Sequence, residues 1–466
     1  MNVIKFGGTS VGTVESFKEV IKIITSYAEK EKTIVVISAL GGITNKIISA
    51  IEEAENGSDS YLELYSEIKS RHLNYLENLI DPGNYSEAQN KLEQVLTGLK
   101  NKLDGVRLLQ HAGPKIYDSI VSIGELLSQT LLVYSLKSSG LSAIAYDAKN
   151  FIKTDSNFGD ADILFDEANE KIRITFIGLK EKEIAVVNGF TGSNKFGETT
   201  TLGRSGSDYT ATMIGAALKV KSVDIWTDVD GIFNADPQHI PSAENIPQLS
   251  YDETIELSSL GAKVIFPKSV LPVKAANIPI KILNTFNPSS PGTVITSETN
   301  NFPNNIISIT SLEEVGIVTI PDIAGNHSLQ VLSQITNLLS VHQVALLNVS
   351  QNYHNRSITL VAYNRDIDRI VNIAESVFKN NFNRTVKIEV LTEIGIVSIL
   401  TDNHFSNADV LNRSANTLLQ SGIQYRIISN YNSRALEFLV KNSDVKKTVT
   451  LLHNIFFSKK RQANVA

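Results

Sequence analysis

Residues 2–12 read NVIKFGGTSVG and place a lysine, two adjacent glycines and two hydroxyl residues at the end of a short apolar run. The run has the pattern of a buried strand, and a helical pattern follows from about Val14 to Lys30. Each glycine would cost about 0.5–1 kcal/mol relative to alanine inside a strand or helix, so the pair belongs to the turn. Bare N–H groups at a strand-to-helix turn suit an anion. An ordinary tight turn is the alternative.

Further strands alternate with helical stretches up to about residue 300. Buried-strand patterns occur at TIVVIS (33–38), AIAYD (143–147), EIAVVNGF (183–190), VDIWTD (223–228) and IPIKIL (278–283). Residues 47–110 are mostly helical in pattern. This alternation predicts an α/β domain with a mainly parallel sheet covered by helices on both faces. Residues 284–305, rich in Pro, Asn and Ser, indicate its end.

An internal repeat follows. EVGIVTIPD (314–322) returns as EIGIVSILTD (393–402), and each copy continues with a helix, two strands and a second helix. The order βαββα therefore occurs twice, and each copy needs one more strand to complete a small sheet. Two ordinary α+β units would satisfy this pattern. Units of this size also resemble the ACT module, a small-molecule sensor, and we place them at 306–388 and 389–460.

Composition excludes several classes of function. The chain has 466 residues and a net charge of −6, so it lacks the basic footprint of a nucleic-acid-binding protein. It contains 0 cysteines, which excludes disulfides, thiolate metal sites and cysteine nucleophiles. We expect no targeting segment and no apolar run near the ~20 residues that span a bilayer. A cytoplasmic enzyme or sensor is predicted.

Three further segments carry polar side chains typical of a binding site. SALGGITN (38–45) repeats the glycine pair after a strand, with Thr44 and Asn45 placed to cap the next helix. In TTTLGRSGSD (199–208), the guanidinium of Arg204 between glycines suits a carboxylate, whereas Asp208 could be an ordinary helix-start acid. The two Gly-Gly loops, in KFGGTS (5–10) and SALGGITN (38–45), would lie along one sheet edge, where ligands of α/β sheets gather.

Acids and lysines later in the domain allow more than one interpretation. Asp228 and Asp230 could bind a divalent metal, accept bonds from a ribose or adenine, or form a solvated turn. Lys263 and Lys268, in GAKVIFPKS (261–269), are suited to neutralising phosphate charge. The eight histidines show no metal-ligand spacing.

Together these motifs resemble those of the aspartate kinases. KFGGTSV, SALGGITN, SIGEL, TTTLGRSGSDYTA, DIWTDVDGI and GAKV occur in that family's order and spacing, and the repeat resembles its tandem ACT pair. The resemblance implies an amino-acid kinase fold in residues 1–300, followed by two ACT-like βαββαβ units. It also implies that the γ-phosphoryl group of ATP, with Mg2+, is transferred to the β-carboxylate of L-aspartate. The product, 4-phospho-L-aspartate, begins the route to lysine, threonine and methionine.

The resemblance also assigns roles to individual residues. Lys5 would meet the transferring phosphoryl group, and Asp208 would place Lys5. Aspartate would be bound by Ser38, Thr44, Glu125 on its ammonium group, and Arg204 on its α-carboxylate. Nucleotide contacts are implied for Lys5, Gly7, Gly8, Thr9, Thr227, Asp228, Phe233, Gln238 and Lys263. No side chain is assigned as a metal ligand. The family further suggests an amino-acid effector at the ACT units, a homodimer or homotetramer, and, from the length, a monofunctional enzyme.

The chain departs from the family's pattern at four positions. Phe233 and Gln238 replace a usual tyrosine and arginine of the nucleotide site, and Phe266 replaces a frequent histidine. Leu347 stands where lysine-sensitive relatives have an acid, so lysine feedback is less expected than kinase activity. A catalytically silent amino-acid sensor on the same fold, or a kinase for another carboxylate, are the alternatives.

Overall fold

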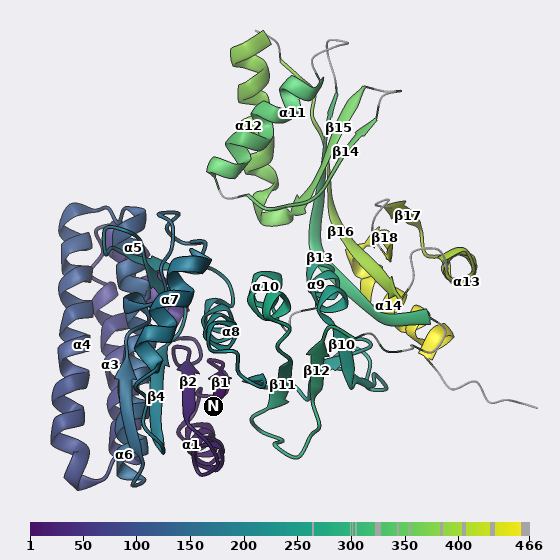
Figure 1. The fold of residues 1–466 in the computed structure, drawn as a ribbon. Coiled ribbons are helices and arrows are strands. Elements are labelled where there is room, and N and C mark those ends of the chain that lie inside the picture. Colours follow the sequence, from purple (N-terminus) through teal and green to yellow (C-terminus); the bar gives the residue numbers. More distant parts are fainter. Residues whose placement is uncertain are drawn as a thin grey trace, which may run out of the picture. The chain divides into compact units, whose positions relative to one another are not determined.

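The computed structural model describes residues 1–262, 265–298, 300, 302, 305–321, 328–342, 344–352, 354, 356–382, 385–402, 407–428 and 434–457. The chain forms two compact units (Figure 1). The first contains Met1–Ile232, Asn245–Ser258 and Lys263–Asn300, and the second contains Phe233–Glu244, Ser259–Ala262 and Asn301–Ala466. Two short segments from within the predicted kinase range therefore pack with the second unit. The predicted three-part division stays a prediction.

The first unit is built on an eight-stranded sheet. Its strand order is β10-β12-β11-β7-β1-β2-β4-β3, and every pair of neighbouring strands is parallel except β11 with β12. The strands are β1 (Asn2–Phe6), β2 (Thr33–Ile37), β3 (Ser142–Tyr146), β4 (Glu183–Asn188), β7 (Val223–Thr227), β10 (Gln248–Ser250), β11 (Ile280–Asn284) and β12 (Thr293–Thr296). Because β1 lies between β2 and β7, the loops after these three strands meet at one sheet edge. Two further pairs of short strands are separate from this sheet: β5 (Thr191–Ser193) with β6 (Thr199–Thr201), and β8 (Ile232–Phe233) with β9 (Asn245–Ile246).

Helices cover this sheet, and α3, α4 and α6 pack together beside it (Figure 1). The helices are α1 (Val14–Ala28), α2 (Ile43–Glu55), α3 (Tyr61–Leu79), α4 (Pro82–Leu109), α5 (Pro114–Val121), α6 (Ile123–Ser138), α7 (Phe165–Phe176), α8 (Gly206–Leu218), α9 (Tyr251–Ser259) and α10 (Pro267–Ala276). Almost every residue of α6 is buried, and the Gln129 side chain donates hydrogen bonds to the carbonyls of Tyr146 and Val186. The predicted helix-covered α/β fold is confirmed.

The stretch Pro114–Ser138, which contains α5 and α6, was not anticipated as an apolar run. Among the described residues it alone is long and apolar enough to cross a membrane, by length and composition only. Its most apolar 18-residue window has a mean hydropathy of 1.3, and 89% of that window is buried inside the protein. Burial of this extent is typical of a core helix, and α6 packs on the sheet as one.

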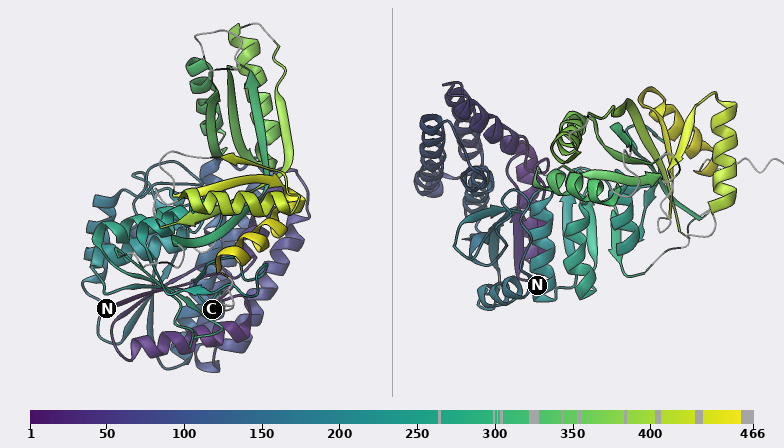
Figure 2. Two further views of the ribbon diagram at one scale, coloured as in Figure 1. Left: turned by 90° about the vertical axis from the view of Figure 1, so that its right-hand side faces the viewer. Right: turned by 90° about the horizontal axis from the view of Figure 1, so that it is seen from above.

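The second unit is one six-stranded antiparallel sheet shared by both sequence repeats (Figure 2). Its order is β14-β15-β13-β16-β18-β17. The strands are β13 (Ile306–Pro321), β14 (Leu346–Asn352), β15 (Ser357–Tyr363), β16 (Glu389–Thr401), β17 (Tyr425–Ile428) and β18 (Ala435–Lys441). The helices are α11 (Ser328–Val341), α12 (Asn364–Phe382), α13 (Asn407–Gln420) and α14 (Val445–Phe457).

The strand that each βαββα repeat lacked comes from the other repeat. The first half of β13, from Ile306 to Leu312, pairs with Ile396–Thr401 of the second repeat, and the start of β16 pairs with Ile317–Thr319 of the first. The two repeats therefore exchange strand halves along the β13–β16 pair, which the ACT-like interpretation needed and the sequence did not show.

The crossing between the repeats contains two strained residues in equivalent positions. Glu314 (φ 55°) and Glu393 (φ 59°) both adopt the left-handed conformation, which costs a residue with a side chain roughly 1–2 kcal/mol.

We predict that Glu314→Gly or Glu393→Gly stabilises the protein by about 0.5–1 kcal/mol each, because glycine adopts this conformation without that cost. Thermal unfolding followed by circular dichroism would measure the change. Glu313→Gly, at a neighbouring position outside the left-handed region, should destabilise instead; equal losses in all three variants would contradict the prediction.

Candidate active site

A cavity of about 380 Å³ opens in the first unit where the loops after β1, β2 and β6 meet helix α6. It is lined by Lys5 and Gly8, by Ser38–Gly42 with Thr44 and Asn45, by Glu125 and Phe190, and by Gly203–Asp208. The cavity therefore brings together Lys5, Gly8, Ser38, Thr44, Glu125, Arg204 and Asp208 from the predicted set. Gly7, Thr9, Thr227 and Asp228 are not in its lining.

The ammonium group of Lys5, at the wall of the cavity, is held by a buried ion pair. The Lys5 Nζ atom at the end of β1 lies 2.5 Å from Asp208 Oδ1, in the first turn of α8. The two residues are only 8% and 5% exposed. A charge pair so removed from water needs good geometry to offset its desolvation. Asp208 is thus more than a helix-start acid: it fixes the ammonium group of Lys5 at the cavity wall.

The two glycine loops approach each other too closely for side chains. A Cβ atom on Gly8 would lie 3.0 Å from the carbonyl oxygen of Ala39, and one on Gly41 would lie 3.0 Å from that of Gly8. The glycines are therefore needed for the approach of one backbone to the other, as well as for an open cavity. Gly7 donates its N–H to the Trp226 carbonyl at 3.2 Å, so this group binds β7 and is not a free anion donor.

Arg71 of α3 holds both loops from outside, and sequence reasoning missed it. Its guanidinium donates to the carbonyls of Gly41 and Gly12, at 2.7 Å each. Tyr75, one turn later, donates to the carbonyl of Val11 at 3.0 Å. Only the spacing of an arginine and a tyrosine on one face of the predicted helical region hinted at this role.

Glu125 presents a buried carboxylate to the cavity. It is 3% exposed, and its Oε1 accepts the N–H of Ala39 at 3.2 Å. Its Oε2 has no hydrogen-bond partner among the residues that the structure describes. Burial raises the pKa of this carboxyl group to about 8. An incoming ammonium group would supply the missing partner and favour the ionised form.

This pKa predicts a pH-dependent affinity for an amino substrate. Below pH 8 the free carboxyl group is mostly protonated, so binding an ammonium must release a proton, and the KM should fall up to about tenfold per pH unit toward that pH. Glu125→Gln should have a high KM without this dependence. Steady-state kinetics between about pH 6.5 and 8.5 would test it, with the exposed Glu77→Gln as control. A pH-independent KM in the unmodified protein would count against the assignment.

The same pKa has a consequence for stability. The folded protein binds a proton at Glu125 that the unfolded chain has lost between about pH 4.5 and 8, so stability falls as pH rises through that window. Glu125→Gln removes this term. The variant should therefore unfold at a higher temperature than the unmodified protein at pH 8.5, and the difference should shrink at pH 5.

Arg204 lies on a loop with a constrained backbone, whereas the Arg204 side chain itself is not fixed by an ion pair with a residue that the structure describes. Gly203 (φ 69°) and Ser205 (φ 55°) adopt left-handed conformations on either side of it. The Arg204 side chain is exposed, lines the cavity, and makes no ion pair with another described residue. Its guanidinium is therefore available to a ligand carboxylate.

Other predicted residues are placed outside the cavity lining. Thr227 ends β7 and Asp228 follows it at the same sheet edge, and the Thr227 hydroxyl donates to Asp228 at 3.1 Å. Asp230 accepts from the amides of Asn284 and Asn287 at 2.9 and 3.0 Å. Phe233 and Gln238 belong to the second unit, and Lys263 lies outside the described residues. The nucleotide contacts of all these residues stay predictions.

One expectation from the sequence was wrong. Thr44 and Asn45 do not cap α2, whose N-cap is Gly42 (φ 83°) without a side-chain hydrogen bond; both line the cavity instead. Lys268 forms ion pairs with Asp160 and Asp162 at 3.0 and 3.1 Å, and its expected role in neutralising phosphate stays a prediction. The described residues also contain no cluster of three or more His, Asp or Glu side chains that could hold a metal ion.

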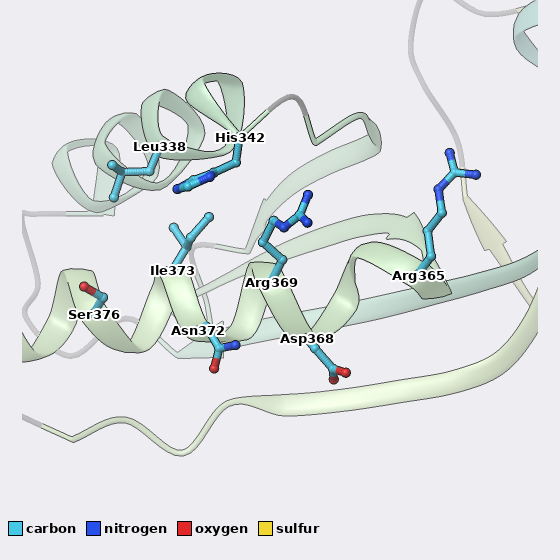
Figure 3. A pocket seen from close by; sticks show the side chains of 8 residues that line it. All are labelled: Leu338, His342, Arg365, Asp368, Arg369, Asn372, Ile373 and Ser376. Atoms are coloured by element: carbon cyan, nitrogen blue, oxygen red, sulfur yellow. The ribbon is translucent and has the colours of Figure 1, made fainter. Parts of the chain in front are cut away.

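The second unit has a cavity of its own, of about 500 Å³, between the end of α11 and the length of α12 (Figure 3). Leu338 and Ile373 form its apolar wall, the ring of His342, directly after α11, is directed toward these two side chains, and Arg369 of α12 adds a guanidinium to the lining (Figure 3). Asp368 is the one acidic residue of the lining. The cavity therefore offers more donors for an anion than acceptors for a cation.

Comparison with known proteins identifies the family. Residues 1–284 match the model of the amino acid kinase family. Aspartokinase 2, chloroplastic, of Arabidopsis thaliana is 32% identical, over 98% of this chain and 84% of its own length. The chain belongs to the amino acid kinase family, among the aspartokinases. This kinase spans 57% of another relative, the bifunctional aspartokinase/homoserine dehydrogenase of Buchnera aphidicola, which is 29% identical over 99% of this chain.

Solved aspartokinases share the fold of the kinase. E. coli aspartokinase III in complex with aspartate and ADP (R-state) superposes with a TM-score of 0.84 at 27% identity, covering 98% of this chain and 100% of that chain. The same enzyme with lysine and aspartate (T-state) gives 0.77 at 26% identity, covering 98% and 99%. The predicted family, fold and enzyme class are thus confirmed.

Proposed function

We propose that this kinase transfers the γ-phosphoryl group of ATP to the β-carboxylate of L-aspartate, giving 4-phospho-L-aspartate and ADP. The observation that carries the proposal is the charge pattern of one cavity. A buried lysine beside bare glycine loops suits phosphate, while the unpartnered Glu125 oxygen and the free Arg204 guanidinium match the ammonium and α-carboxylate of an amino acid.

The proposed mechanism needs positioning and positive charge rather than a covalent nucleophile. Glu125 and Arg204 hold the substrate by its two α-substituents, which leaves the β-carboxylate directed toward Lys5. A β-carboxylate oxygen then forms a bond to the γ-phosphorus as the bond to the β–γ bridging oxygen breaks, and the electron pair leaves with ADP. Lys5 stabilises the charge that develops on the transferring group, and Asp208 keeps Lys5 in place.

The residues present fit ATP with Mg2+. The close glycine loops leave room for phosphate oxygens, and Ser38 and Thr44 add hydroxyl groups at the cavity wall. Mg2+ is commonly held by substrate phosphates, water and one or two carboxylates. When bound, the ion would neutralise phosphate charge, and Asp208 is the carboxylate in the lining beside Lys5.

A coupled assay of ADP release with aspartate and MgATP tests the proposal. Turnover that depends on aspartate, with glutamate and acetylglutamate inactive, is the expected result. Activity only with another carboxylate would replace the substrate. Amino-acid binding without turnover would instead favour a silent sensor subunit.

We further propose that an amino acid acts on the second unit, since E. coli aspartokinase III has been solved with lysine. Leu347 is half-buried against the apolar cluster of Val315, Ile317 and Ile394, so the position offers no acid to a lysine ammonium group. The assay repeated with lysine, threonine and methionine, singly and together, would identify the effector; inhibition by lysine alone would contradict this reasoning. A cytoplasmic location and a homodimer or homotetramer stay predictions.

A further inference from the structure

Asp118 of α5 is a buried carboxylate outside the cavity lining. It is 0% exposed and accepts three hydrogen bonds from two other segments. Its Oδ2 accepts the N–H groups of Thr201, at 2.7 Å, and Gly159, at 2.9 Å, and its Oδ1 accepts the Thr201 hydroxyl at 3.0 Å. Hydrogen bonds to an ionised acceptor are about twice as strong as neutral ones. A carboxylate buried with three donors therefore fixes these segments firmly.

The segments that Asp118 joins lead directly to the two proposed aspartate-binding side chains. On one side, α5 ends at Val121 and α6 begins at Ile123, which places Glu125 in its first turn. On the other side, Thr201 ends β6, three residues before Arg204. The Thr201 carbonyl is also fixed, because it accepts the N–H of Ala161 at 2.9 Å.

The loop after Thr201 continues from this anchored residue to Arg204. Leu202 donates its N–H to the carbonyl of Phe190 at 2.9 Å, and Gly203 packs against the Asp160 carboxylate. Because the Arg204 side chain is exposed and makes no ion pair with a described residue, only the backbone sets where its guanidinium lies.

We infer that Asp118 is a positioning residue that sets the separation between Glu125 and Arg204, and so the affinity and selectivity for the amino-acid substrate. The inference rests on the proposed function for the identity of that substrate. The brace, meaning the three hydrogen bonds that join Asp118 to Thr201 and Gly159, rests on the contacts alone. Since it acts on the amino-acid side of the cavity, its loss should affect aspartate more than ATP.

Asp118→Asn retains the size of the side chain and loses its charge. We expect the KM for aspartate to rise about tenfold, as for a weakened charged hydrogen bond, with the KM for ATP changed less than twofold. Thr201→Val, which removes only the hydroxyl donor, should show a smaller change in the same direction. Thr201→Ser, which keeps the donor, should behave as the unmodified protein. Asp81→Asn, at the N-cap of α4, is a matched control that should alter neither KM.

A purely structural role would lower the melting temperature and the active fraction but leave both KM values unchanged, and that result would overturn the inference. Hydrogen–deuterium exchange supplies a readout that needs no activity: Asp118→Asn should speed exchange of residues 199–206, and Asp81→Asn should not. If the unmodified protein fails to phosphorylate aspartate while this segment still loosens, the proposed function fails and the brace stands. Unchanged exchange with unchanged KM values would refute the brace.

Discussion

Replacing Lys5 by methionine is expected to reduce kcat by about a thousandfold. The Lys5 ammonium group is the charged donor in the cavity that lies against the glycine loops, and loss of one such transition-state donor commonly costs about 10²–10³ in kcat. Methionine keeps the length of the side chain and removes the charge. Steady-state kinetics at saturating aspartate and MgATP would measure the loss, and near-normal turnover would remove Lys5 from the mechanism.

A second effect must be separated from the first. Lys5→Met leaves Asp208 as a buried charge without its partner, which is expected to destabilise the fold by about 3–5 kcal/mol. The double variant Lys5→Met/Asp208→Asn removes both charges and should recover much of the melting temperature. It should not recover kcat. If the double variant regained activity along with stability, the role of Lys5 would be structural.

Much of the fold could be predicted because its pattern is local. The buried strands before Gly7 and Gly41 and the strand at 223–228 are each visible as a β-branched apolar run, and their parallel pairing follows from the helices between them. The shared sheet of the second unit could not be predicted in the same way. The exchange of strand halves between β13 and β16 depends on pairing between residues far apart in the sequence, such as Ile309 and Ile399, which are 90 residues apart. The sequence of either repeat taken alone gives no signal for this pairing.

The residues of the candidate site also differ in whether a local sequence pattern could predict them. Lys5 and Arg204 could be predicted because each lies close to glycines whose positions in the sequence are not explained by core packing. Arg71 and Asp118 lie on regular helices, where an arginine or aspartate usually faces water, and their roles follow only from carbonyl and N–H groups brought to them by tertiary structure. The expected caps at Thr44 and Asn45 failed for the opposite reason: a left-handed Gly42 began the helix and left their side chains for the cavity.

Replacing Arg204 by alanine is expected to raise the KM for aspartate by about 10- to 150-fold, with little change for ATP. The range corresponds to about 1.5–3 kcal/mol for hydrogen bonds to a charged group. The fold should be unaffected, because the guanidinium is exposed and the loop is held by its backbone, including the Gly206 N–H on the carbonyl of Gly203 at 3.2 Å. Initial rates with each substrate varied in turn would separate the two KM values, and an unchanged melting temperature would exclude misfolding.

Arg204→Lys refines the test. A lysine keeps the positive charge but cannot make the two parallel hydrogen bonds that a guanidinium offers to a carboxylate. The KM for aspartate in this variant should therefore lie between those of the unmodified protein and Arg204→Ala. An aspartate analogue that keeps the amino group and the β-carboxylate but lacks the α-carboxylate should bind all three proteins equally poorly, because its missing group is the one that Arg204 contacts. Equal increases in both KM values, or an analogue that still distinguishes the variants, would show that Arg204 supports the loop and does not bind the substrate.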